Sequence, residues 1–277
     1  HKSSRGLGDV YKRQELVSYM AINASSDLAK ERGSYSSYEG SLWSQGILPL
    51  DSIEILEKQR GKDYIEVDKT TRLDWDALRE KVKTQGMRNS NTMAIAPTAT
   101  IANITGLTQS IEPTYSNLFV KSNLSGEFTV INMHLVAALK EIDMWDEVMV
   151  YDLKNLNGSL ESIARVPEDI KKLFATSFEV EPKWLIEAAS RRQKWIDQSQ
   201  SLNLYVSEPN GKKLDVMYRM AWLRGLKTTY YLRSRSATTT EKSTITNMEL
   251  NAVKTEPKTY DQPEACSIDD PDCEACQ

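Results

Sequence analysis

The chain contains the segment Thr92-Met93-Ala94-Ile95-Ala96-Pro97-Thr98-Ala99-Thr100-Ile101, in which a short apolar run ends at a proline. Residues 92–96 predict a buried strand, because a brief apolar run closed by a turn residue is typical of a strand inside a sheet. Small residues follow Pro97, and a helix is expected over residues 100–104. A strand that leads directly into a helix is the repeating unit of α/β folds, so this segment indicates that class.

The alternation of strands and helices continues on both sides of this segment. Apolar spacing, capping residues and prolines predict helices over 15–32, 74–86 and 214–223, after Asn132, and from Pro167 and Pro182. Strands are predicted over 117–120, 128–131, 202–206 and 228–232, and a loop over 33–50. The pattern predicts an α/β fold with a mostly parallel sheet.

Composition excludes several classes of protein. The chain has 277 residues, of which 40% are hydrophobic and 27% charged, and its net charge is −4. The apolar runs are too short for a transmembrane span, and the mild acidity argues against a nucleic-acid or membrane-surface partner. All three cysteines lie in the last 12 residues, which excludes a disulfide-stapled secreted scaffold. We therefore expect a soluble, cytoplasmic protein.

Residues 1–14 differ from the rest of the chain. They show no hydrophobic period and no signal-peptide core, so we expect neither a helix nor a targeting signal there. Reverse translation of Ser4 to Gln14 resembles a transposase-type sequencing adapter. We therefore interpret residues 1–14 as a non-native leader and Glu15 as the first residue of a longer natural protein, although composition also allows a disordered basic arm.

The last part of the chain, residues 234–277, is rich in serine and threonine and has no periodic apolar face, which predicts a flexible tail. It carries Cys273 and Cys276 in a Cys-x-x-Cys pattern, which suits either zinc or thiol–disulfide exchange. Zinc lacks a full ligand set here, since the two histidines are His1 and the distant His134. A redox pair on a mobile arm is favoured, with Cys266 as a bystander or a secondary resolving thiol.

Two further segments contain residues that suit ligand binding or electron transfer. The backbone amides that follow Pro97 open a predicted helix and suit a phosphate group, although an ordinary strand–helix turn is the default interpretation. No Walker pattern and no usable dinucleotide fingerprint supports that site. The adjacent Tyr230 and Tyr231 most simply place one ring in the core and the other at the surface, but tyrosines also pass electrons and protons.

Taken in order, these segments resemble the C-terminal part of the large (α) subunit of class I ribonucleotide reductase. The resemblance covers residues 15–277 and is carried by Leu28-Ala29-Lys30-Glu31, Ser44-Gln45-Gly46-Ile47-Leu48-Pro49, Gly86-Met87-Arg88-Asn89-Ser90, Ala96-Pro97-Thr98-Ala99-Thr100, Ser110-Ile111-Glu112-Pro113, Leu124-Ser125-Gly126-Glu127-Phe128, Leu226-Lys227-Thr228-Thr229-Tyr230-Tyr231 and Cys273-Glu274-Ala275-Cys276.

The resemblance implies a ten-stranded α/β barrel, of which residues 15–233 supply the last strands and helices. It implies that the substrate, a ribonucleoside diphosphate, is bound through Pro97, Thr98, Ala99, Thr100 and Ile101. Tyr230 and Tyr231 become the last relays that carry a radical from the small (β) subunit. Because a regular strand sends neighbouring side chains to opposite faces, stacked relay rings require a local irregularity at this pair.

The resemblance also implies partners and limits. Cys273 and Cys276 re-reduce the active-site disulfide and are reduced in turn by thioredoxin or glutaredoxin. The helix over 214–223 helps to form a groove for the small subunit's tail. The dimetal and tyrosyl-radical cofactor belongs to that subunit, ATP and dNTP effectors bind upstream, and the full-length large subunit is a homodimer. The thiyl-radical cysteine also lies upstream, so we expect these residues alone to be inactive and to bind no cofactor or metal.

Two other interpretations remain open. The adenosylcobalamin-dependent reductase shares the barrel, the phosphate loop and the terminal cysteines, but it generates its radical in place and needs no tyrosine pair. A non-enzymatic adaptor with a zinc-binding cysteine tail is the alternative from another class.

Overall fold

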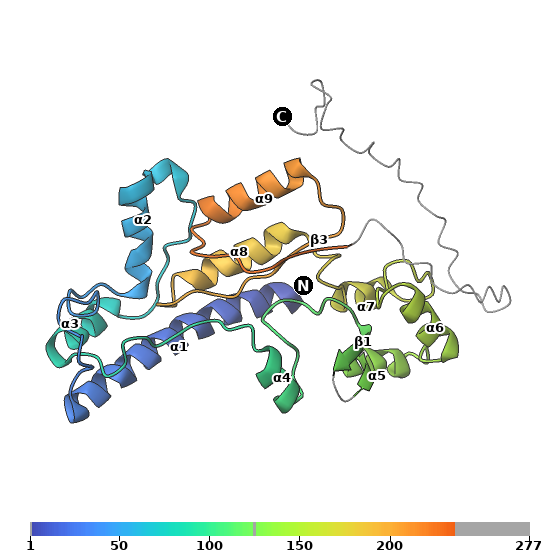
Figure 1. Cartoon of the computed structure of the whole chain (residues 1–277), viewed down its shortest axis with the longest axis horizontal. Helices are drawn as coiled ribbons and strands as arrows, with labels where there is room; N and C mark the ends of the chain where they lie inside the picture. Colours follow the sequence, from blue (N-terminus) through green and yellow to red (C-terminus); the bar gives the residue numbers. More distant parts are fainter. Residues whose placement is uncertain (1, 124–125, 236–277) are drawn as a thin grey trace, which may run out of the picture.

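The computed structural model describes residues 2–123 and 126–235. Three helices are stacked one above another, with α8 (Pro182–Gln193) between α1 (Lys2–Arg32) and α9 (Gly211–Leu223) (Figure 1). The short strands β3 (Leu204–Val206) and β4 (Leu232–Ser234) pair in parallel beside them. Helices and strands thus alternate, and the predicted α/β class is confirmed.

The first helix begins earlier than the sequence predicts. We expected no helix before Glu15, but α1 starts at Lys2 and continues without interruption to Arg32. The physical reason is that residues 2–14 contain no proline, so nothing blocks extension of the helix toward its N-terminus. Gly6 and Gly8 lower the helix propensity by about 1 kcal/mol each but do not forbid the conformation.

A first apolar cluster packs α1 against α3 (Trp75–Gln85). The N-cap predicted at Asp74 is confirmed, since its Oδ1 accepts a hydrogen bond from the Ala77 amide at 3.0 Å. The helix ends at Gly86, as predicted. The buried members of this cluster are Ile22, Tyr38, Trp43, Leu48, Trp75, Leu78, Val82, Met87 and Trp195.

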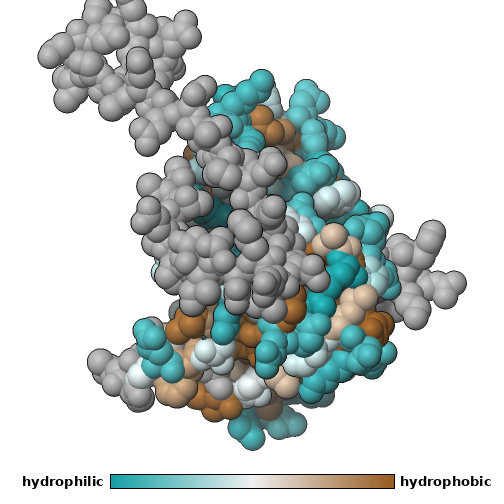
Figure 2. Space-filling view, turned by 90° about the vertical axis from the view of Figure 1, so that its right-hand side faces the viewer, coloured by the Kyte–Doolittle hydropathy of each residue, from teal (hydrophilic) through white to brown (hydrophobic). Residues whose placement is uncertain are grey.

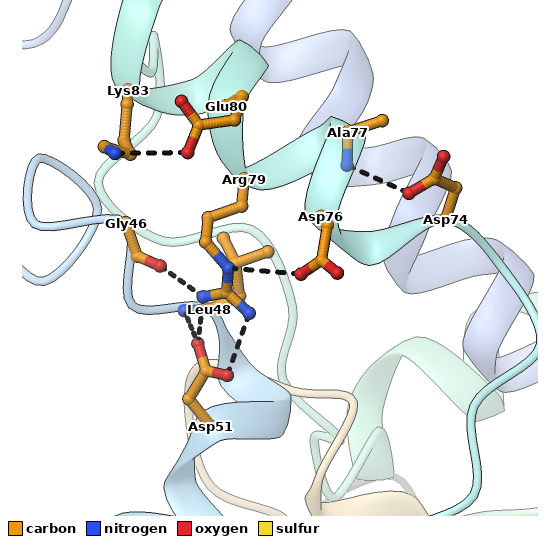
Figure 3. Close-up of polar contacts among 9 residues, drawn as sticks. All are labelled: Gly46, Leu48, Asp51, Asp74, Asp76, Ala77, Arg79, Glu80 and Lys83. Atoms are coloured by element: carbon orange, nitrogen blue, oxygen red, sulfur yellow. Dashed lines mark hydrogen bonds and ion pairs between the residues drawn. The ribbon is translucent and has the colours of Figure 1, made fainter.

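The expected loop before the second helix is held by one arginine. Arg79 on α3 donates two hydrogen bonds to the carboxylate of Asp51, and its Nη1 also donates to the carbonyl of Gly46 (Figure 3). The same carboxylate accepts from the Leu48 amide at 2.7 Å. Hydrogen bonding to Asp51 keeps the pKa of Arg79 above its usual value, despite partial burial. This bidentate contact fixes residues 46–51 ahead of α2 (Ser52–Arg60). The short 3₁₀ turns η1 (Pro49–Asp51) and η2 (Lys62–Tyr64) flank α2.

A second cluster surrounds β3 and combines α8 with α9. Pro182 occupies the first turn of α8, as predicted. The strand predicted over residues 228–232 is displaced toward the C-terminus, because the ladder with β3 pairs Leu204 with Leu232 and so begins there. The buried residues are Leu185, Ile186, Ala189, Leu202, Leu204, Tyr205, Val206, Met217, Ala221 and Leu226.

A third cluster underlies the antiparallel hairpin of β1 (Leu118–Asn123) and β2 (Gly126–Ile131). This hairpin departs from the mostly parallel sheet that we predicted, because two strands joined by so short a connection pair only in the antiparallel sense. The helices beside it are α5 (Met133–Glu141), α6 (Glu147–Asn155) and α7 (Glu168–Leu173). As predicted, Asn132 caps α5, accepting from the amides of His134 and Leu135. The buried members are Leu118, Leu135, Leu139, Met149, Leu153, Leu160, Ile163 and Val166.

The surface retains large apolar side chains, which Figure 2 shows in brown among the hydrophilic residues of one face. Several lie on α1 and around α4 (Ala99–Thr105), including Val17, Met20, Ile101, Ile104 and Leu107. Among residues 2–123 and 126–235, no helix is both long enough and apolar enough to span a membrane.

Glu15 is a buried carboxylate that fastens α1 to the segment before α3. It is only 4% exposed, and its Oε1 accepts hydrogen bonds from the amides of Arg72 (2.7 Å) and Leu73 (3.1 Å) and from Nε1 of Trp75 (3.0 Å). Burial opposes its ionisation, but these hydrogen bonds outweigh that effect and hold the pKa of Glu15 below its usual value of 4.5. The ionised carboxylate therefore stabilises the fold.

The substitution Glu15→Gln is expected to lower the free energy of unfolding at neutral pH by about 1–3 kcal/mol, because a neutral acceptor replaces a charged one. A lowered folded-state pKa contributes stability above pH 4.5 that disappears as the pH falls through the folded value. Urea unfolding should therefore show the difference at neutral pH and little difference well below 4.5. Glu54→Gln, at an exposed site, serves as the control; an equal gap at both pH values would contradict the prediction.

Candidate functional site

The predicted phosphate-binding segment, Pro97 to Ile101, follows an extended stretch that contains a single bridge residue, Ile95. Of the strand expected over residues 92–96, only a single parallel bridge forms, between Ile95 and Gln200. The physical reason is that residues 199–201 provide the only backbone hydrogen bonds for Ile95 among the described residues: its amide donates to Ser199, and its carbonyl accepts from Ser201. Residues 96–98 therefore connect this bridge to the start of α4.

The start of α4 exposes backbone amides, as the sequence predicts. The first intrahelical bond runs from the Ala102 amide to the Thr98 carbonyl at 2.7 Å, so the amides of residues 99–101 precede it. Pro97, Ala99, Thr100 and Ile101 are all exposed, and no large polar side chain of this run covers the amides. Thr98 itself adopts the left-handed conformation, with φ 54° and ψ 18°. This geometry suits an anion.

A series of hydrogen bonds ties this segment to β3. The Ser110 amide donates to Oγ1 of Thr98 at 3.1 Å, and the Glu112 amide donates to Oγ of Ser110 at 3.2 Å. The Glu112 carboxylate is buried and accepts from both the amide (3.1 Å) and Nδ2 (3.2 Å) of Asn203. No local sequence pattern indicates this link, because the partner of Glu112 is 91 residues away.

Tyr230 and Tyr231 lie immediately before β4 rather than inside a strand. Their ring centroids are 4.1 Å apart with planes inclined by 53°, and the side chains are 51% and 52% exposed. The predicted local irregularity is therefore confirmed, and the expectation that one ring enters the core is wrong. Hydrogen bonding to the Tyr231 hydroxyl raises the pKa of Tyr230 above its usual value of 10.0.

The two predicted sites share one backbone element. The Tyr230 amide donates to the Leu202 carbonyl, and the Leu204 amide donates to the Tyr231 carbonyl, each at 2.8 Å. Asn203, which binds Glu112, lies between these two leucines. Residues 202–204 therefore connect the start of α4 to the tyrosine pair through hydrogen bonds.

The helix predicted to face a partner, α9, carries an exposed aromatic side chain near its end. Trp222 is 43% exposed, and the Arg60 guanidinium lies over its ring with Cζ 4.6 Å from the centroid. Nη1 of Arg60 donates to the Trp222 carbonyl at 3.1 Å, and the Tyr64 ring meets the indole edge-on. Trp222 is thus presented at the surface between α2 and α9.

The cysteines of the predicted tail and the histidine weighed as a zinc ligand complete the survey of singled-out residues. Cys266, Cys273 and Cys276 fall outside the described residues, as does most of the predicted tail. His134 is exposed in the first turn of α5. Within residues 2–123 and 126–235, no three histidine, cysteine, aspartate or glutamate side chains gather in a way that could hold a metal ion.

Comparison with known proteins identifies the fold. Residues 3–232 match the family model described as the ribonucleotide reductase barrel domain. The chain is 61% identical over 231 residues to the ribonucleoside-diphosphate reductase subunit alpha of Chlamydia muridarum, covering 83% of this chain and 22% of that protein. It is 53% identical over 277 residues to the subunit alpha of Chlamydia trachomatis, covering 95% of this chain and 26% of that protein.

A solved structure agrees with these matches. The class Id ribonucleotide reductase alpha subunit of Actinobacillus ureae superposes with a TM-score of 0.50 and 26% sequence identity, covering 71% of this chain and 37% of that one. The chain spans about a quarter of the length of the two chlamydial relatives. The chain therefore belongs to the ribonucleotide reductase barrel-domain family.

Proposed function

We propose that the chain serves in the reduction of ribonucleoside diphosphates to deoxyribonucleoside diphosphates, as part of the large subunit of a cytoplasmic, radical-dependent oxidoreductase. The observation that carries the proposal is the pair of contacting rings of Tyr230 and Tyr231. A tyrosine that passes both an electron and a proton needs its neighbour close to it, and a regular strand would separate the two rings. Family membership supplies the reaction class.

In this proposal the start of α4 binds the diphosphate of the substrate. The amides of Ala99, Thr100 and Ile101 point away from the helix before its first internal bond, and the positive end of the helix dipole favours an anion there. Thr98 is held by the Ser110 amide, so the turn is fixed before substrate arrives. Pro97 ends the preceding extended segment.

Thr100→Asp in the full-length reductase tests the binding step. A carboxylate beside the open amides repels the diphosphate, so we expect KM for the substrate to rise by roughly tenfold to a hundredfold. An acidic residue in the first turn of a helix does not destabilise it, so the loss is not one of folding. The neutral isostere Thr100→Asn is the matched control and should leave KM within about twofold; an equal KM for both variants would contradict the assignment.

The proposal gives the remaining parts of the chain roles in electron supply. A radical reaches Tyr231 and then Tyr230 from a small subunit that carries the dimetal and tyrosyl-radical cofactor, and Trp222 on α9 lines the contact with that subunit's tail. Cys273 and Cys276 return electrons to the active site after each turnover and are themselves reduced by thioredoxin or glutaredoxin. The working large subunit is a homodimer, and residues 15–277 alone are inactive, because no cysteine precedes Cys266.

A further inference from the structure

An arginine two positions beyond the tyrosine pair contacts one of its rings. Arg233 lies on β4, and its guanidinium is positioned over the ring of Tyr231 with Cζ 5.2 Å from the centroid. The next arginine along the chain, Arg235, makes the same kind of contact with Phe178, at 4.8 Å. One cation therefore lies on a ring that can be oxidised and the other on a ring that has no phenolic proton.

The charge of Arg233 also reaches two other phenols. Burial raises the pKa of Tyr205 and of Tyr115, and in both cases the positive charge of Arg233 acts in the opposite direction. Tyr205 is buried on β3, where the strand register pairs it with Arg233 of β4. Arg233 thus lies at the junction between the exposed tyrosine pair and the core.

We propose that Arg233 is a positioning residue for the radical relay, holding the Tyr231 ring against Tyr230 and making the Tyr231 radical the stronger oxidant of the two. This inference rests on the relay proposed above. The step that it favours is Tyr231–O• + Tyr230–OH → Tyr231–OH + Tyr230–O•, in which one electron and one proton both pass from Tyr230 to Tyr231. The oxidant that starts the step is the radical delivered by the small subunit.

The direction of the effect follows from the cation–π contact. A guanidinium stabilises the electron-rich ring of the intact phenol, and this attraction weakens once the ring has lost an electron. The contact therefore favours the reduced form of Tyr231 and moves the radical onward to Tyr230. At an exposed site the contact is expected to shift the distribution of the radical by roughly two- to fivefold.

The test uses the full-length large subunit assembled with its small subunit. Arg233→Gln should lower turnover by roughly two- to fivefold and leave the affinity between the subunits unchanged. In the same variant, a polyfluorinated tyrosine at position 231 should restore turnover, because electron-withdrawing fluorines make its radical a stronger oxidant; the assay is run at a pH at which that phenol stays protonated. A variant that had merely lost its local structure would gain nothing from this replacement.

Arg235→Gln is the matched control, because it removes an equivalent cation from the redox-inert ring of Phe178, and its turnover should stay at the wild-type level. The inference is overturned if Arg233→Gln retains full turnover, or if its loss is not restored by the fluorinated residue. Failure of the relay itself would appear differently, as full turnover after Tyr231→Phe.

Discussion

Turnover by the assembled full-length reductase is expected to fall by about a thousandfold or more when Tyr230 is replaced by phenylalanine. Phenylalanine preserves the ring that contacts Tyr231 at 4.1 Å but has no phenolic proton. Oxidation of that ring would leave a charged radical cation in place of a neutral radical, so the transfer step becomes prohibitively slow. Initial rates of deoxyribonucleoside diphosphate formation measure the effect.

Binding should be almost unaffected by this change. The Tyr230 hydroxyl is not part of the amide run that starts at Thr98, so the affinity for substrate is expected to stay near that of the unmodified protein. Tyr64→Phe provides the matched control, because Tyr64 is similarly exposed (54% against 51%) and lies on η2 beside Trp222. If Tyr230→Phe kept its activity, the relay would be refuted and a cofactor that forms its radical in place would be favoured.

Gly158→Ala is expected to produce the largest loss of stability, about 3–5 kcal/mol. Gly158 has φ +77°, and a Cβ there would lie 2.6 Å from the amide nitrogens of both Asn117 and Leu118 and also against Oγ of Ser116. The first two are backbone atoms at the start of β1 and cannot rotate away. The Gly158 carbonyl also accepts from Nδ2 of Asn117 at 2.9 Å, so any shift breaks a buried hydrogen bond.

Gly40→Ala separates the clash from the backbone strain. Gly40 has nearly the same positive φ, +82°, but no atom lies within 4 Å of the place that a Cβ would occupy. Its substitution should cost only about 1 kcal/mol, the usual penalty for alanine in this region of φ. Denaturant unfolding of the two variants compares the costs directly, and equal losses would show that contacts around Gly158 do not matter.

The features that sequence analysis predicted correctly are local ones. Asp74 and Asn132 cap the helices that follow them, and Pro182 opens α8, because each effect depends on residues within one turn of the chain. The start of α4 was also predictable, since Pro97 ends the extended run and small residues follow it. The resemblance to a known family supplied the expectation that the two tyrosine rings would lie together.

The features that were missed depend on partners far away in sequence. The buried carboxylate of Glu112 binds Asn203, 91 residues away, and no local pattern in the sequence indicates that contact. Glu15 is a second example, because its carboxylate accepts hydrogen bonds from amides 57 and 58 residues further along the chain. The position of β4 was misjudged because apolar and aromatic content suggested residues 228–232, whereas pairing with β3 determines where the strand begins.

The bond between Glu112 and Asn203 has a mechanical consequence. Electron transfer between aromatic rings falls off steeply with separation. The proposed relay therefore requires a backbone that keeps the two rings at a constant distance. Asn203 is fixed on one side by the segment leading back to Thr98, and the leucines on either side of it hold the backbone of Tyr230 and Tyr231. If the start of α4 binds the diphosphate as proposed, a displacement of that turn would pass through these hydrogen bonds to the backbone of the two tyrosines.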